Sequence, residues 1–92
     1  MVTAKGTVKN KYGIHCRPSG VISKAVKEYK GVIEIVNDEG KVGNPRSVLS
    51  MLGLCLACGD GFTVNVTGPD EEAMCSRLVG LLESEYEYKK ES

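Results

Sequence analysis

The chain of 92 residues has no tryptophan, only one phenylalanine and one histidine, and no excess of charge of either sign. With one phenylalanine and four tyrosines, it offers too few aromatic side chains for a platform that stacks single-stranded nucleic acid. Twelve basic and twelve acidic residues cancel, which argues against a general binder of nucleic acids or membrane surfaces. We therefore expect no nucleic acid among its partners.

Long apolar runs and nucleotide-binding motifs are also missing. No hydrophobic stretch approaches the length of a membrane span, and residues 1–15 lack a signal-peptide core. These features predict a cytoplasmic protein without membrane insertion, whose four cysteines are mostly reduced thiols. There is neither a Walker-type loop nor a G-x-G-x-x-G motif. We expect no cofactor, and any phosphate handled here would arrive from another protein.

The first half of the chain shows alternating strand and helix patterns. Val2, Ala4, Gly6 and Val8 alternate with polar residues and predict a strand. Apolar residues at helical spacing predict a helix from Arg17 that ends at Gly31. A β-branched run predicts a second strand over 32–36. Residues 38–40 predict a hairpin turn, which leads to a short third strand over 41–44, before Pro45.

The second half of the chain predicts two more helices around a strand. Ser47 is a good N-cap for a short helix over 48–52. A fourth strand with alternating apolar residues follows over 62–66. The last helix starts at 68–72, and its buried stripe is Met74, Leu78, Leu81 and Leu82. Gly80 inside it costs about 1 kcal/mol relative to alanine, and the sequence does not decide whether it serves close packing.

The resulting order, β-α-β-β-α-β-α, predicts the α+β class. We expect an open-faced β-sandwich in which a four-stranded antiparallel sheet carries three helices on one face. A split β-α-β arrangement would place the fourth strand between the first and the second. Residues 1–88 should form a single domain and residues 89–92 a frayed tail.

The chemistry-bearing segment is Gly-Ile-His-Cys-Arg-Pro at residues 13–18, which contains the single histidine, His15. Neutral imidazole is a good nucleophile near pH 7. The guanidinium of Arg17 suits phosphate oxygens, and Pro18 is tolerated in a first helical turn. A phosphate on His15 would therefore face Arg17 and the backbone N–H groups of Cys16 and Arg17 at the helix start.

This segment, with Arg46-Ser47-Val48-Leu49 and Gly68-Pro69-Asp70-Glu71-Glu72-Ala73, resembles the HPr family over nearly the whole chain. That family comprises the histidine-containing phosphocarriers of the bacterial phosphoenolpyruvate-sugar phosphotransferase system. The resemblance implies that His15 accepts a phosphoryl group from enzyme I and passes it to IIA domains of sugar permeases. Arg17 would stabilise the phosphohistidine. Such a carrier is a substrate of two enzymes and is not itself an enzyme.

The resemblance also implies a regulatory site and a docking surface. Ser47 stands where the family carries a serine that is phosphorylated by an HPr serine kinase/phosphorylase, and it can equally be a simple N-cap. Pro45 and Ser50 depart from the family pattern around it, as Cys16 departs from the usual alanine beside the histidine. The expected partner-binding residues of the monomer are Val21, Lys24, Lys27, Val48, Leu49 and Leu52.

Three other functions compete with that of a sugar-transport phosphocarrier. One is a regulatory HPr-like paralogue that acts mainly through protein binding. Another is a redox or metal-binding domain built on Cys55-Leu-Ala-Cys58. A zinc site needs four ligands, however, and nothing else in the sequence has metal spacing. We therefore expect no metal and interpret these cysteines as buried small thiols. The third, a cysteine-nucleophile enzyme, would pair Cys16 with His15 and lacks an orienting third group.

Overall fold

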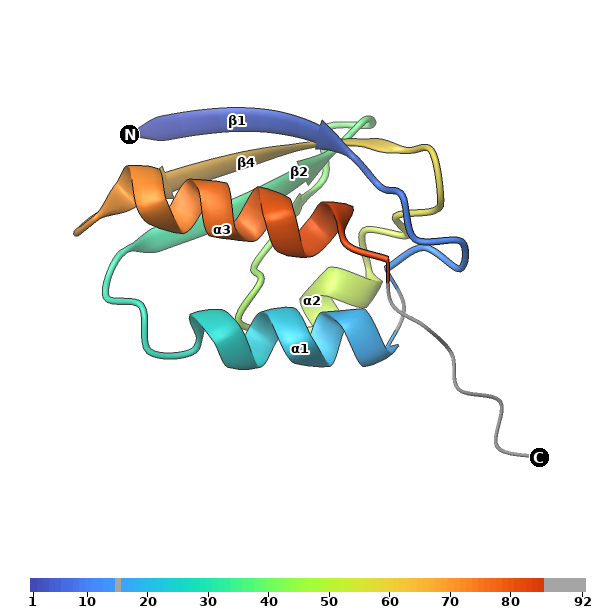
Figure 1. Cartoon of the computed structure of the whole chain (residues 1–92), viewed down its shortest axis with the longest axis horizontal. Coiled ribbons are helices and arrows are strands. Elements are labelled where there is room, and N and C mark those ends of the chain that lie inside the picture. The colour runs from blue at the N-terminus through green and yellow to red at the C-terminus, as the bar shows by residue number, and fades with distance from the viewer. Residues whose placement is uncertain (15, 86–92) are drawn as a thin grey trace.

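The computed structural model describes residues 1–14 and 16–85. It contains the predicted sequence of elements, in which a four-stranded sheet carries the helices on one face (Figure 1). The strands pair antiparallel in the order β1-β4-β2-β3, so the prediction of the fourth strand between the first and second is confirmed. The elements are β1 (Val2–Thr7), α1 (Cys16–Val26), β2 (Val32–Asn37), β3 (Val42–Gly43), α2 (Val48–Leu52), β4 (Gly61–Thr67) and α3 (Glu71–Glu83).

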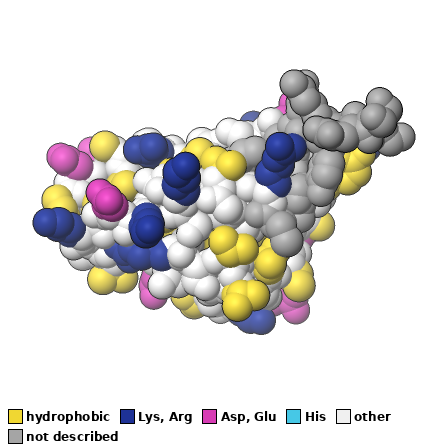
Figure 2. Space-filling model, turned by 90° about the horizontal axis from the view of Figure 1, so that it is seen from below, with side chains coloured by type: hydrophobic (Ala, Val, Ile, Leu, Met, Phe, Trp, Pro, Cys, Tyr) yellow, Lys and Arg dark blue, Asp and Glu magenta, His cyan; other side chains and the backbone are white. Residues whose placement is uncertain are grey.

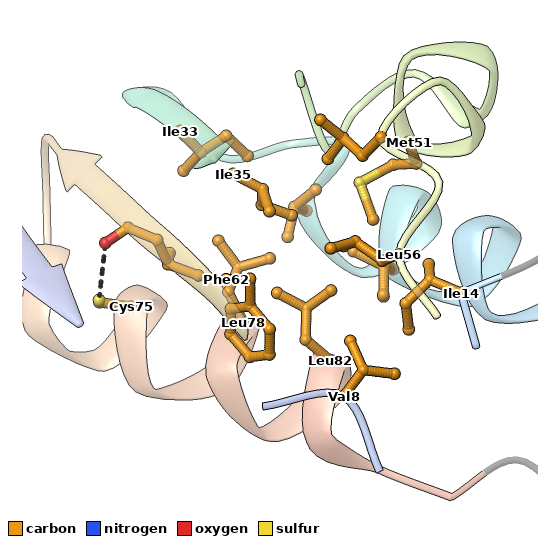
Figure 3. Close-up of a cluster of buried hydrophobic side chains, with 14 of the residues drawn as sticks. Val8, Ile14, Ile33, Ile35, Met51, Leu56, Phe62, Cys75, Leu78 and Leu82 are labelled. Carbon is orange, nitrogen blue, oxygen red and sulfur yellow. Dashed lines mark hydrogen bonds between the residues drawn. The ribbon is translucent and has the colours of Figure 1, made fainter. Parts of the chain in front are cut away.

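The core lies between the sheet and the helices (Figure 3). In β4, Phe62, Val64 and Val66 are buried while the residues between them are not, as the period of two in the sequence predicts. Val8, which the sequence pattern included in the first strand, lies just beyond β1 and is also buried. Within the described ranges, the helices are too short or too polar to cross a bilayer.

The predicted end of the first helix is wrong. α1 ends at Val26, after which the Tyr29 N–H donates to the Val26 carbonyl in a turn (3.1 Å). Gly31 lies against the backbone of Thr67, where a Cβ would be only 2.3 Å from the Thr67 carbonyl oxygen. Glycine is needed there for the close approach of two backbones and not as a helix end. The third strand is also shorter than the expected 41–44, since only Val42–Gly43 pairs with β2 as a strand.

The last helix begins where predicted, but its buried stripe differs. The Gly68 N–H donates to the Glu71 carboxylate (3.3 Å), and this bond holds the pKa of Glu71 below its ordinary value. The fully buried side chains are Cys75, Leu78 and Leu82, whereas Met74 and Leu81 are only partly covered. Gly80 is exposed, and a Cβ there would meet nothing within 4 Å, so this glycine does not serve close packing.

Two residues of α2 allow a matched test of the core. Met51 is 0% exposed and Leu49 is 81% exposed, although both lie on the same short helix. We expect Met51→Ala to lower the free energy of unfolding by about 2–5 kcal/mol, since it leaves a cavity. Leu49→Ala should change it by less than about 0.5 kcal/mol. Urea denaturation measures both, and similar losses for the two variants would contradict this packing.

Candidate functional site

His15 lies outside the described residues, but the structure describes the chain on both sides of its position. Before it, the buried residue Ile14 donates its backbone N–H to the Leu56 carbonyl at 2.8 Å. After it, α1 begins at Cys16. The described chain is thus held by a backbone hydrogen bond directly before position 15 and is helical directly after it.

A compact loop precedes this position. The buried Asn10 donates from its side-chain amide to the Gly13 carbonyl (2.8 Å), and the Gly13 N–H donates to the Asn10 carbonyl (2.9 Å). Gly13 has a φ of +72°, and a Cβ there would lie 2.4 Å from the Leu56 carbonyl oxygen. Only glycine fits both constraints. Asn10 was not predicted as a positioning residue, because an asparagine in a polar turn is a common and weak local signal.

The start of α1 is the place where the sequence predicts an anion site, and that site stays a prediction. The helix begins at Cys16, so the N–H groups of Cys16 and Arg17 belong to its first turn, where backbone donors have no partner within the helix. Pro18 is buried in this turn, as its missing N–H allows, and the Arg17 side chain is exposed. The positive end of the helix dipole and a cation therefore adjoin the position of His15.

Ser47 is the N-cap of α2, as predicted. Its hydroxyl oxygen accepts a hydrogen bond from the Ser50 N–H at 3.2 Å. The Ser50 hydroxyl in turn accepts from the Asn44 N–H at 2.8 Å. Ser50, a departure from the family pattern, thus helps to fix the loop before α2. Phosphorylation of Ser47 stays a prediction.

Side-chain hydrogen bonds near Ser47 connect the start of α2 to α1 and to the turn that follows α1. The Ser23 hydroxyl of α1 donates to the Arg46 carbonyl at 2.7 Å. The Arg46 guanidinium donates to the carbonyls of Tyr29 and Gly31, the latter at 2.8 Å. These bonds hold the segment before Ser47 against α1, and the two helices pack together.

The predicted docking residues lie on these two packed helices and the turn after α1. On α2, Leu49 is exposed while Val48 and Leu52 are half-buried, so the short helix leaves part of its apolar side chains open to solvent. Val21 (42% exposed), Lys24 and Lys27 are exposed on α1 and just beyond it. On the side where α1 and α2 lie, lysine and arginine side chains gather near hydrophobic ones (Figure 2).

The interpretation of the C-x-x-C cysteines as buried thiols is wrong. Cys55 and Cys58 are both exposed, in the loop between α2 and β4. Of the cysteines whose side chains the structure describes, Cys75 is the buried one: its thiol donates to the Val64 carbonyl (3.9 Å), and burial raises its pKa. In the part of the chain that the structure describes, no group of three or more His, Cys, Asp or Glu side chains could hold a metal ion.

Comparisons with known proteins show the family and agree with the fold. A family model described as "PTS HPr component phosphorylation site" matches residues 2–84. Phosphocarrier protein HPr of Lysinibacillus sphaericus is 35% identical, over 89% of this chain and 92% of that protein. Phosphocarrier protein NPr of Escherichia coli K12 is 32% identical, over 94% of this chain and 98% of that protein. The crystal structure of HPr-C-His from Thermoanaerobacter tengcongensis superposes with a TM-score of 0.82 at 28% identity, covering 90% of this chain and 92% of that one.

Proposed function

Because this chain belongs to the HPr family and is a phosphocarrier of the phosphotransferase system, we propose that His15 is its phosphoacceptor. The phosphoryl group comes from phosphorylated enzyme I and passes on to IIA domains of sugar permeases. The observation that carries the proposal is the anchoring of the chain around position 15. The Ile14 N–H is hydrogen-bonded to the Leu56 carbonyl on one side of this position, and α1 begins at Cys16 on the other.

Phosphoryl transfer requires few groups of the carrier itself. A ring nitrogen of His15 attacks the phosphorus atom, and the bond between phosphorus and its donor atom on phosphorylated enzyme I breaks. Transfer of this kind depends on positioning and on stabilisation of the phosphoryl charge. The N–H groups of Cys16 and Arg17 and the Arg17 guanidinium supply that stabilisation at the start of α1.

Partner recognition is assigned to the surface of α1 and α2. Leu49 and Val21 are apolar and exposed, so a partner can cover them. Lys24 and Lys27 meet acidic groups of the partner and mainly raise the rate of association. The same surface serves enzyme I and the IIA domains in turn, since both must reach the one histidine.

The test is a reconstituted transfer. The purified chain is incubated with enzyme I and phosphoenolpyruvate, and its intact mass is measured. We expect the mass to increase by one phosphoryl group that is labile in acid and stable in base, as a phosphohistidine is. Addition of a IIA domain should return the carrier to its original mass. No uptake of phosphate, or an acid-stable product, would refute the proposal.

We further propose that Ser47 is a regulatory phosphosite, and Ser47→Asp tests it. Aspartate is also a good N-cap, so the thermal stability should change little, whereas Ser47→Ala should lose about 1 kcal/mol. The added negative charge lies beside the docking residues Val48 and Leu49 and opposes an acidic partner. We expect phosphorylation of the Ser47→Asp protein by enzyme I to be at least tenfold slower. An unchanged rate of phosphorylation of Ser47→Asp would show that Ser47 acts only as a helix cap.

A second candidate function is that of a regulatory paralogue which acts mainly through protein binding. The similarity to a protein named NPr, next to those named HPr, supports considering it. The two candidates differ in their acceptors. Rapid transfer from the phosphorylated chain to IIA domains of sugar permeases favours the sugar-transport carrier, and phosphorylation without such transfer favours the paralogue.

A further inference from the structure

The exposed cysteine pair is not explained by packing or by the phosphocarrier site. Cysteine is among the residue types most often buried, yet Cys55 and Cys58 are both exposed free thiols. The residue that anchors their loop is Leu56, whose side chain is 4% exposed and belongs to the core. The core therefore holds the loop through Leu56 and presents the two thiols to solvent.

The same loop lies against the segment that leads to position 15. The Gly59 N–H donates to the Val8 carbonyl (2.8 Å), and the Val8 N–H donates to the Asp60 carbonyl (2.9 Å). The Cys58 thiol donates to the Lys9 carbonyl (3.8 Å). At the far end of the segment, the Leu56 carbonyl accepts from the Ile14 N–H (2.8 Å). A change in the cysteine loop thus reaches the residue directly before His15.

We propose that Cys55 and Cys58 form a dithiol/disulfide couple that controls the conformation of the segment before position 15. The oxidant is a low-molecular-weight disulfide such as oxidised glutathione. One thiolate attacks it, forming a mixed disulfide and releasing one thiol. The second cysteine then attacks the mixed disulfide, which closes the Cys55–Cys58 bond and releases the second thiol. Two protein thiols are oxidised, and one disulfide of the oxidant is reduced to two thiols.

Closure of this bond must act on Leu56, because Leu56 lies inside the ring that the bond creates. A disulfide needs Cα atoms about 4.4–6.8 Å apart. Three residue steps can span about 10 Å when the chain is extended. The bond therefore restricts residues 55–58 to compact turns and fixes the direction of the Leu56 carbonyl, which Ile14 uses as its acceptor. We expect the oxidised loop to weaken the bond from Ile14 to Leu56.

The other cysteine with a described side chain does not compete for this role. Cys75 is 1% exposed and bonded to Val64, and its raised pKa keeps it a protonated thiol. Its reaction with an oxidant in solution should be slow, because the thiolate is the reactive form. The pair in the loop is accessible without unfolding.

The test begins with oxidation of the intact chain by excess oxidised glutathione. Remaining thiols are alkylated and the linkage is located by tandem mass spectrometry. The wild type and Ala57→Ser, a control in the same loop that keeps both thiols, should form the Cys55–Cys58 disulfide. The Cys55→Ser/Cys58→Ser protein should not. Hydrogen exchange at the Ile14 amide should become at least tenfold faster in the oxidised wild type and stay unchanged in the double variant. Only mixed disulfides with glutathione, or unchanged exchange at Ile14 despite closure, would overturn the proposal.

A second readout rests on the proposed function. We expect enzyme I to phosphorylate the oxidised protein at least tenfold more slowly than the reduced protein, and reduction by dithiothreitol should restore the rate. The Cys55→Ser/Cys58→Ser protein should be phosphorylated equally fast before and after oxidation. Failure of the reduced wild type to accept phosphate would count against the proposed function alone, since the disulfide and the Ile14 exchange are measured without enzyme I.

Discussion

The His15→Ala protein is expected to gain no phosphate from enzyme I and phosphoenolpyruvate. His15 is the single histidine of the chain, and alanine offers no nucleophile in place of its imidazole. The effect should be complete, because the carrier has one acceptor and every later step depends on it. Intact mass spectrometry after the reaction measures the outcome.

A matched control separates loss of the acceptor from a general defect. Lys5 lies in β1, and its exposed side chain belongs to a strand away from α1 and α2. Lys5→Ala should take up phosphate at the wild-type rate. Phosphate on the His15→Ala protein under the same conditions would show that another residue is the acceptor.

The Arg17→Ala protein is expected to fold normally and to transfer phosphate about a hundredfold more slowly, which is typical for removal of one positioned donor. Its side chain is exposed in the first turn of α1, so its loss should leave the core unchanged. Arg17→Lys should recover part of the rate, since it keeps the charge but loses the planar fork of donors. Rapid-quench measurement of a single transfer, with saturating phosphorylated enzyme I, gives the rate.

Lys24→Ala is the control for a general effect of charge. Lys24 lies in the last turn of the same helix, so its removal should lower only the rate of association, and added salt should diminish the difference from wild type. Unchanged transfer kinetics in Arg17→Ala would remove Arg17 from the proposed mechanism. A lower thermal stability of Arg17→Ala would show instead that Arg17 is required for the folded structure.

The features that depend on neighbours in the sequence were predictable. The alternation of Phe62, Val64 and Val66 has the period of a strand, and this period alone places them on the buried face. Ser47 caps α2 through a residue three positions away, which is a contact that the local sequence can encode. The strand order followed from the element order, because few connections of such a chain are physically acceptable.

The tertiary structure decided what depends on contacts between distant segments. Gly31 looked like the end of a helix, but the backbone of Thr67 is what requires a glycine there. Hydrophobicity favoured burial of Cys55 and Cys58, yet the core takes up Leu56 between them and leaves both cysteines exposed. The histidine motif could be read from the sequence as a string of chemical groups. Its anchoring depends on the bond from Ile14 to Leu56, which joins two segments that are far apart in the chain and meet only when it folds.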